Sequence, residues 1–290
     1  MNNLKIKVGS ILMLVVMTTA QAQKETAAVS SLPSELIYKV VDGDTLKMEF
    51  IYPQNIKRKK TYPAIVFFFG GGWNGGTTKQ FENQAKYFAS RGMIGILVDY
   101  RVKSRHKTTP FEAVSDAKSA MRFVRSNADR FQIDDDRIVA SGGSAGGHLA
   151  AATATLTGLD ETSDDMNISS VPNALVLFNP VIDNSKEGYG YDRIGERYVE
   201  FSPMHNIKKG TPPTIIFLGR KDALIPTATV EKYKAKMEEV GSRCDLFLYK
   251  DQTHGFFNKD RSNGEFYRKT THEADVFLES LGYIKGKPTI

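Results

Sequence analysis

The stretch 137–150, RIVASGGSAGGHLA, joins an apolar run, a cluster of glycines around one serine and a run of small residues. The apolar run predicts a strand, and the small residues after Gly147 predict a helix. Ser144 stands between them, at a sharp turn that needs neighbours without side chains, and Gly142 and Gly146 meet that need. The N-terminus of the helix would point at negative charge developing near the serine. This context predicts a nucleophile rather than an ordinary serine in a glycine-rich turn.

A serine nucleophile needs a base, an acid that orients the base, and donors for an oxyanion. His254 follows the last predicted strand and is expected at the same sheet edge as Ser144, so it is the predicted base. Asp222 follows an earlier predicted strand and is the predicted acid, because the order Ser, Asp, His is a known order for such triads. Asp183, past the strand before that one, is the next candidate. His148 is expected to project along its helix into local packing.

The rest of the chain alternates between strand and helix patterns. Strands are predicted at 36–41, 46–52, 64–69, 93–98, 174–178, 213–218 and 246–249, and helices at 81–91, 110–124, 229–240 and 271–281. Residues 109–112, TPFE, predict a capping box with proline at the first helical position. Two starting strands followed by repeated strand–helix units predict a single α/β domain with a mostly parallel sheet and helices on both faces. The run Asp134–Asp136 is interpreted as a solvated turn rather than a metal site.

The composition of the chain argues against nucleic-acid binding and against disulfide or cysteine-based metal sites. The chain has 290 residues and a scattered formal charge of +6. Because no basic stripe is interleaved with aromatic residues, nucleic acid is not an expected partner. Cys244 is the sole cysteine, which excludes an intrachain disulfide and a cysteine-based metal site.

Residues 1–22 predict a secretory signal peptide. Lys5 and Lys7 form a positive start, residues 11–17 form a short apolar core, and small residues precede the expected cleavage point. The apolar run is too short for a stable membrane anchor. The mature chain, 23–290, is therefore expected to be exported in soluble form to the periplasm or the medium.

Three segments carry a resemblance to a known family. Residues 69–73 read FGGGW, residues 99–101 read DYR and residues 142–147 read GGSAGG. They resemble the oxyanion motif H-G-G-G-W, the D-Y-R segment and the nucleophile elbow of α/β-hydrolases of the hormone-sensitive-lipase and acetyl-esterase type, near the BD-FAE-like carbohydrate esterases. The resemblance extends over roughly residues 36–282 and implies an α/β-hydrolase fold.

The resemblance also implies an oxyanion hole made of the N–H groups of Gly71, Gly72 and Ala145. Trp73 is expected to crowd the acyl side of this loop and to contact substrate. Phe69 departs from the family motif, because a histidine stands at this position in the motif. That histidine supports the loop and carries no proton, so the departure puts the loop geometry in question and not the chemistry.

Lipase-like members of the family carry a helical cap before the first strand. Residues 23–35 are too few for a large N-terminal cap, so only the segment 183–206 is expected to cover the site. This segment is rich in aromatic residues. An open, aromatic mouth suits short acyl groups on a bulky alcohol such as a glycan, although the aromatic residues could equally pack the segment itself.

The expected function is a secreted serine carboxylesterase that hydrolyses acetyl or similar short acyl esters of a small molecule or a glycan, with no metal or organic cofactor. Two alternatives remain. A serine exopeptidase of the prolyl-oligopeptidase type shares the fold and the elbow, but such enzymes usually carry a propeller domain for which the chain has no room. A non-catalytic binding protein on a hydrolase scaffold is indicated only by Phe69. The oligomeric state is left open.

Overall fold

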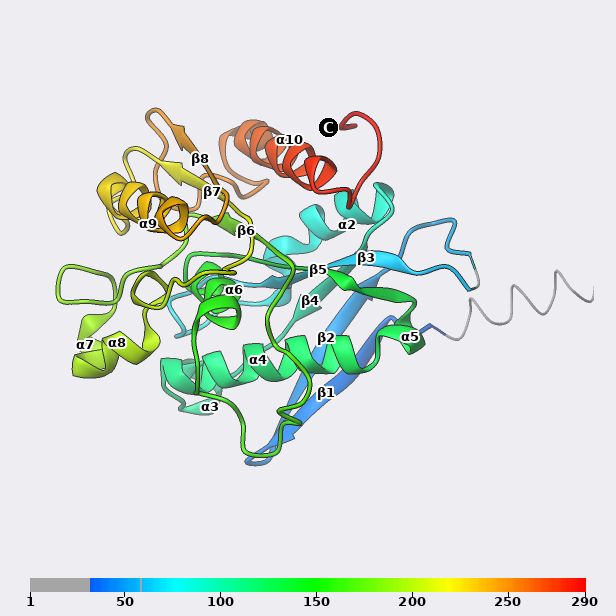
Figure 1. Ribbon diagram of the computed structural model, residues 1–290, viewed down its shortest axis with the longest axis horizontal. Coiled ribbons are helices and arrows are strands. Elements are labelled where there is room, and N and C mark those ends of the chain that lie inside the picture. Colours follow the sequence, from blue (N-terminus) through cyan, green and yellow to red (C-terminus); the bar gives the residue numbers. More distant parts are fainter. Residues whose placement is uncertain (1–31, 58) are drawn as a thin grey trace, which may run out of the picture.

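The computed structural model describes residues 32–57 and 59–290, so the predicted signal peptide lies outside the described residues. Within them, one eight-stranded sheet has the order β1-β2-β4-β3-β5-β6-β7-β8 (Figure 1). β1 with β2 and β2 with β4 pair antiparallel, and the other neighbouring pairs are parallel. This confirms the predicted mostly parallel sheet. The strands are β1 (Glu35–Val41), β2 (Asp44–Ile51), β3 (Tyr62–Phe68), β4 (Ile94–Val98), β5 (Ile133–Gly143), β6 (Ala174–Phe178), β7 (Thr214–Gly219) and β8 (Cys244–Tyr249).

Helices cover both faces of the sheet, as predicted (Figure 1). The side chains of β3 alternate between the two faces, with Val66 and Phe68 in one apolar cluster and Ile65 and Phe67 in the other. The first cluster includes residues of α4 (Pro110–Ser126), α6 (Ala145–Thr155) and α9 (Thr227–Glu239), and the second includes residues of α2 (Glu82–Ser90) and α10 (Glu265–Ser280). Four-residue helices are α3 (Lys103–His106), α5 (Ala128–Phe131), α7 (Tyr191–Ile194) and α8 (Tyr198–Phe201).

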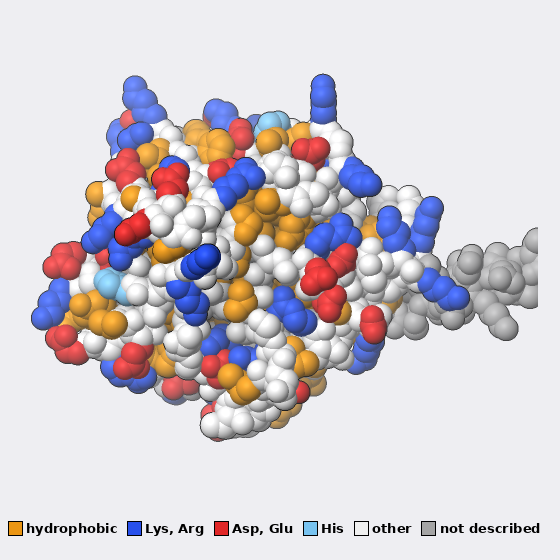
Figure 2. All heavy atoms as spheres, viewed as in Figure 1, with side chains coloured by type: hydrophobic (Ala, Val, Ile, Leu, Met, Phe, Trp, Pro, Cys, Tyr) orange, Lys and Arg blue, Asp and Glu red, His pale blue; other side chains and the backbone are white. Residues whose placement is uncertain are grey.

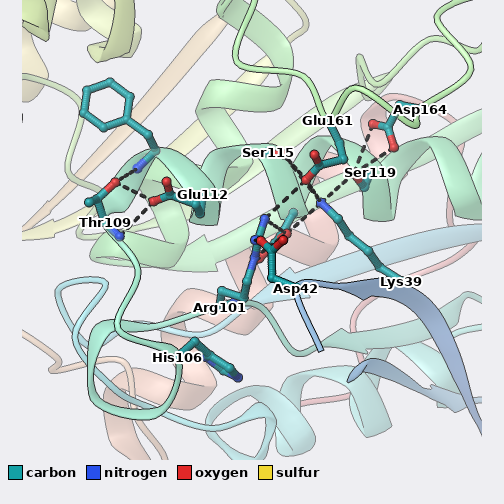
Figure 3. A network of polar contacts seen from close by, with 12 residues as sticks. Lys39, Asp42, Arg101, His106, Thr109, Glu112, Ser115, Ser119, Glu161 and Asp164 are labelled. Atoms are coloured by element: carbon teal, nitrogen blue, oxygen red, sulfur yellow. Dashed lines mark hydrogen bonds and ion pairs between the residues drawn. The ribbon is translucent and has the colours of Figure 1, made fainter. Parts of the chain in front are cut away.

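The start of α4 follows directly from the local sequence. Thr109 caps the helix, Pro110 occupies the first turn, and Glu112 accepts the backbone N–H of Thr109 at 2.8 Å (Figure 3). This reciprocal arrangement satisfies N–H groups that the first turn of a helix otherwise leaves unpaired. The predicted capping box is confirmed.

Two predicted boundaries are wrong. α10 begins at Glu265, six residues before the predicted start at 271, because Tyr267 and Thr270 are buried although polar residues separate them. Asp134–Asp136 belong to the start of β5 and not to a turn. A register shift in the pairing of β3 with β5 accommodates these residues. Asp134 Oδ2 lies 2.6 Å from Arg137 Nη2.

A buried network of charges joins α4 to β1 and to the segment 156–173 (Figure 3). Lys39 Nζ lies 2.8 Å from both Asp116 Oδ1 and Glu161 Oε2, and Arg101 Nη2 lies 2.9 Å from Asp116 Oδ1. The hydrogen bond from Lys39, together with its positive charge, lowers the pKa of Glu161. Since the Asp116 side chain is fully buried, its two cationic partners depend on it to offset their desolvation.

No helix in the part of the chain that the structure describes is long and apolar enough to cross a membrane. Figure 2 shows Lys and Arg side chains interspersed with Asp and Glu, between small apolar patches, over the face in view. On this face the Lys and Arg side chains are thus spread out and do not form one positive surface.

Asp116→Ala should lower the free energy of unfolding by about 3–5 kcal/mol, because it leaves buried cations without their main partner. Urea denaturation followed by circular dichroism measures the change. Asp135→Ala is the matched control, since Asp135 is exposed, and should change the stability by less than about 0.5 kcal/mol. Equal, small effects of the two substitutions would contradict a stabilising role for the network.

Candidate active site

Ser144 lies in a strained turn between β5 and α6, with φ 54° and ψ −118°. A Cβ on Gly146 would lie 2.1 Å from the carbonyl oxygen of Phe68, and a Cβ on Gly142 would lie 2.4 Å from the backbone of Gly146. Only glycine fits at either position, because no side chain tolerates such distances. The serine therefore stands at the carboxyl edge of the sheet for the local reason that the sequence predicts.

The structure brings Ser144, His254 and Asp222 together. Ser144 Oγ lies 2.8 Å from His254 Nε2, and His254 Nδ1 lies 2.7 Å from Asp222 Oδ2. The other carboxylate oxygen of Asp222 accepts the N–H groups of Leu224 and Ile225 at 2.9 and 3.0 Å. The Asp222 side chain is fully buried, whereas a quarter of His254 is exposed. The backbone bonds thus orient the carboxylate toward the imidazole.

Asp183, the second candidate for the acid, is engaged elsewhere. Its carboxylate accepts the N–H of Ser185 at 2.9 Å, and its carbonyl accepts the N–H of Tyr189 at 3.0 Å. These bonds form the start of the segment 183–206. Asp183 thus shapes the cover of the site, and Asp222 is the aspartate at His254.

The glycine loop presents free donors beside the serine. Gly71 and Gly72 have φ values of 134° and 61°, and a Cβ on Gly71 would lie 2.1 Å from the carbonyl oxygen of Gly75. Within residues 32–57 and 59–290, no hydrogen bond uses the N–H of Gly71, Gly72 or Ala145. Ala145 is the first residue of α6, where N–H groups have no partner inside the helix. These three N–H groups are available to a bound oxygen.

Asn179 is a site residue that sequence reasoning missed. It follows β6 directly and is fully buried, and its Oδ1 accepts the N–H of Gly255 at 3.0 Å. This bond directs its Nδ2 to His254 Nε2, 3.3 Å away. The sequence could have indicated Asn179, because a polar residue directly after a buried parallel strand is expected at the same sheet edge as Ser144.

Trp73 differs from its predicted place. Its indole is only 2% exposed and does not line the cavity; it packs 5.1 Å from the ring of His148 and 5.1 Å from the guanidinium of Arg193. Gly72 and Trp73 both have positive φ, 61° and 56°, so the chain turns here, and the indole packs in the apolar core and not in the cavity. Trp73 thus packs against His148 and Arg193 and does not line the cavity over Ser144, so its contact with substrate stays a prediction.

His148 packs locally, as predicted. Its ring is buried, and Nε2 lies 3.0 Å from the carbonyl oxygen of Phe201. Burial lowers its pKa to about 3, so the imidazole is neutral at pH 7 and donates Nε2–H to that carbonyl. It contributes to the wall behind Trp73 and does not reach Ser144 as a base.

A cavity of about 940 Å³ opens over Ser144 and His254. The segment 183–206 supplies a polar side through Tyr189, Asp192 and Arg193. The segment 223–226 supplies an apolar side, where Leu224 is 45% exposed. The site is therefore open and mixed in polarity, with the predicted cover segment forming part of its wall.

Comparison with known proteins identifies relatives over nearly the whole chain. The BD-FAE family matches residues 48–187, and the Dienelactone hydrolase family matches residues 187–281. A thermophilic esterase of Thermogutta terrifontis with bound propionate is 42% identical, with a TM-score of 0.84 over 89% of this chain and 98% of that one. The same esterase phosphonylated by cyclosarin matches with 44% identity and a TM-score of 0.84, over 87% of this chain and 96% of that one.

Among curated proteins, an acetylxylan esterase of Xylanibacter ruminicola is 26% identical over 272 residues, which is 88% of this chain and 50% of that protein. Esterase LipC of Mycobacterium tuberculosis is 26% identical over 77% of this chain and 59% of that protein. The chain thus spans about half the length of the curated relatives it matches first. All of these relatives are described as esterases.

Proposed function

Because this chain belongs to the α/β-hydrolase esterase family and is a serine esterase, we propose that Ser144, His254 and Asp222 carry its reaction. The observation that carries the proposal is the continuous hydrogen-bonded series from Ser144 Oγ through His254 to a buried carboxylate. It is the arrangement that acyl transfer by a serine requires. The esterase relatives decide against the non-catalytic alternative.

Ser144 Oγ attacks the ester carbonyl carbon while His254 Nε2 takes its proton. Asp222 accepts Nδ1–H and stabilises the imidazolium that forms. His254 then returns the proton to the alkoxide oxygen, so that the alcohol leaves and an acyl-serine remains. A water molecule attacks this ester with the same base, and the carboxylic acid is released.

The oxyanion of each tetrahedral intermediate is assigned to the N–H groups of Gly71, Gly72 and Ala145. Their lack of other partners within the described residues supports this assignment. Donors already held in place need no reorganisation when charge develops, and the loss of one costs about 10²–10³-fold in rate in comparable sites. The N-terminus of α6 adds its dipole at the same point.

The proposed substrates are short acyl esters of a carbohydrate. The Thermogutta terrifontis esterase has been described with propionate and with butyrate bound, and one curated relative is an acetylxylan esterase. Tyr189 and Arg193 offer a ring face and hydrogen-bond donors to a sugar, and Leu224 supplies apolar surface in the same cavity. The exopeptidase alternative has no such support and is tested by assaying acetylated xylan beside a peptide amide.

Ser144→Ala should lower kcat for 4-nitrophenyl acetate by about 10⁴-fold or more, because the covalent route is removed. Steady-state kinetics and labelling by a fluorophosphonate probe measure the loss, and an unchanged urea midpoint shows that the variant folds. Activity within about tenfold of the wild type would refute Ser144 as the nucleophile.

Asp222→Asn should lower kcat by about 10²–10⁴-fold, because the amide can no longer hold and stabilise the imidazolium. Asp183→Asn is the matched control, since its carboxylate contacts Ser185 and not His254. It should change kcat by less than about fivefold. If Asp183→Asn lowered kcat more than Asp222→Asn did, the acid would be Asp183, which follows the earlier strand.

The preference for acyl-chain length should depend on how much apolar surface the cavity wall offers to the acyl group. A buried methylene is worth about 0.8 kcal/mol, but only where apolar surface receives it. We expect kcat/KM to be highest for acetyl or propionyl esters and to fall by hexanoyl. Leu224→Ala should lower activity on butyryl relative to acetyl esters, whereas Val276→Ala, 42% exposed on α10 and away from the cavity, should not. A wild-type preference for octanoyl esters would contradict the short-acyl assignment.

Export of the protein is proposed from residues 1–22, which lie outside the described residues. The support is their charged start, short apolar core and small residues before position 23. Expression in a bacterium with an export pathway should release a single domain of residues 23–290, detected as a mature N-terminus at Gln23 by mass spectrometry. A cytoplasmic product that keeps Met1 would contradict export.

A further inference from the structure

We propose that Gln80 and Asn258 form a hydrogen-bonded relay that holds the oxyanion loop, residues 70–76, in place relative to His254. Both are positioning residues that act through the backbone. The inference rests on the proposed roles of Ser144, His254 and the loop N–H groups, and it concerns how two separate loops keep one geometry during the reaction.

The relay begins at the oxyanion loop. The N–H of Gly70 donates to Gln80 Oε1 at 2.6 Å, and Gln80 Nε2 donates to Asn258 Oδ1 at 3.2 Å. Asn258 Nδ2 then donates to the carbonyl oxygen of Gly255 at 2.8 Å, one residue beyond His254. Three hydrogen bonds therefore connect the residue before the proposed oxyanion donors to the residue after the proposed base.

The orientation of both side-chain amides is determined by the backbone groups at the two ends of the relay. A backbone N–H at Gly70 requires an acceptor, and a backbone carbonyl at Gly255 requires a donor. With Gln80 Oε1 toward Gly70, its Nε2 must face Asn258, and Asn258 Nδ2 is then left for Gly255. Flipping either amide would oppose two donors or two acceptors, so the two side chains support a single arrangement.

Gly255 is held from both sides. Its carbonyl accepts from Asn258, and its N–H donates to Oδ1 of the buried Asn179. Gly255 has φ 78°, a conformation that few other residues adopt without strain. These two hydrogen bonds limit movement of the loop that carries His254. Through Asn258 and Gln80, the position of Gly70 is tied to that loop.

Phe69 stands at the position of the motif's histidine and supplies no side-chain hydrogen bond to the loop. The Phe69 ring stacks on Tyr100, with ring centroids 4.1 Å apart, and it offers no hydrogen bond to the loop. The hydroxyl of Tyr100 donates to the Phe69 carbonyl at 2.7 Å, which fixes the start of the loop only. Gln80 supplies a side-chain hydrogen bond to the next residue, Gly70.

Both amide side chains also line the cavity, so a direct contact with substrate is the competing explanation. The two explanations predict changes in different kinetic constants. A misplaced oxyanion loop lowers kcat, since displacement of catalytic groups by about 1 Å costs up to about 10²-fold. A lost substrate contact raises KM with kcat unchanged.

The experiment is a double-mutant cycle with Gln80→Met, Asn258→Leu and the double variant, assayed on 4-nitrophenyl acetate. Each single variant should lower kcat by about 10–100-fold with KM within about twofold of the wild type. The double variant should be within about threefold of the worse single variant, because either substitution already breaks the relay. Gln54→Met and Asn55→Leu, exposed residues at the other end of the sheet, are the matched controls.

Gln80→Glu separates the relay from simple anchoring of Gly70. It keeps an acceptor for the Gly70 N–H but places a carboxylate oxygen against Asn258 Oδ1. The relay predicts a loss of kcat similar to that of Gln80→Met, together with a matching loss in the rate of phosphonylation, which uses the same oxyanion donors. Urea midpoints close to the wild type identify the variants that fold, and the comparison is made among those.

Several results would overturn the relay. Multiplicative effects of the two single substitutions, a rise in KM alone, or wild-type kcat in Gln80→Glu would each do so. Ser144→Ala is run in parallel. If Ser144→Ala is inactive while the Gln80 variants behave as wild type, only the relay fails; if Ser144→Ala stays active, the proposed function itself fails.

Discussion

The passage from β5 into α6 through one strained residue constrains every other part of the site. Ser144 turns the chain with φ 54°, and its N–H donates to the carbonyl oxygen of Phe178 at the end of β6. On the other side, Gly146 fits so closely against the end of β3 that a Cβ would overlap the carbonyl oxygens of Phe68 and Phe69. The turn is thus wedged between its two neighbouring strands, and the serine hydroxyl and the N–H of Ala145 are placed as one unit.

Parallel pairing then gathers the remaining groups. β5, β6, β7 and β8 are adjacent and parallel, so their carboxyl ends meet at one edge. Each strand is followed by one side chain of the proposed site: Ser144, Asn179, Asp222 and His254. Because sheet register sets the spacing of these ends, residues up to 110 positions apart come within hydrogen-bond distance. Loops alone could not maintain such distances, since each would move independently.

The cover of the site is attached to the oxyanion loop and not only to the sheet. Arg193, from the segment 183–206, donates to the Gly72 carbonyl and lies with its guanidinium 5.1 Å and 5.3 Å from the rings of Trp73 and Tyr189. These contacts combine a hydrogen bond with cation–π attraction at a partly buried site. The loop is therefore held at Gly70 by Gln80 and at Gly72 by Arg193.

Local chemistry allowed the sequence alone to predict the strand–turn–helix at Ser144, the capping box at Thr109 and the strands of the sheet, since glycine, capping residues and apolar periodicity act over a few positions. Chain order also singled out Asp222 and His254. Only the tertiary structure decided that Trp73 packs in the core and that Asn179, Gln80 and Asn258 link the loops of the site. Their partners lie up to 178 residues away, and no local pattern encodes a hydrogen bond between distant side chains. Such contacts exist only after the sheet has brought its carboxyl ends together.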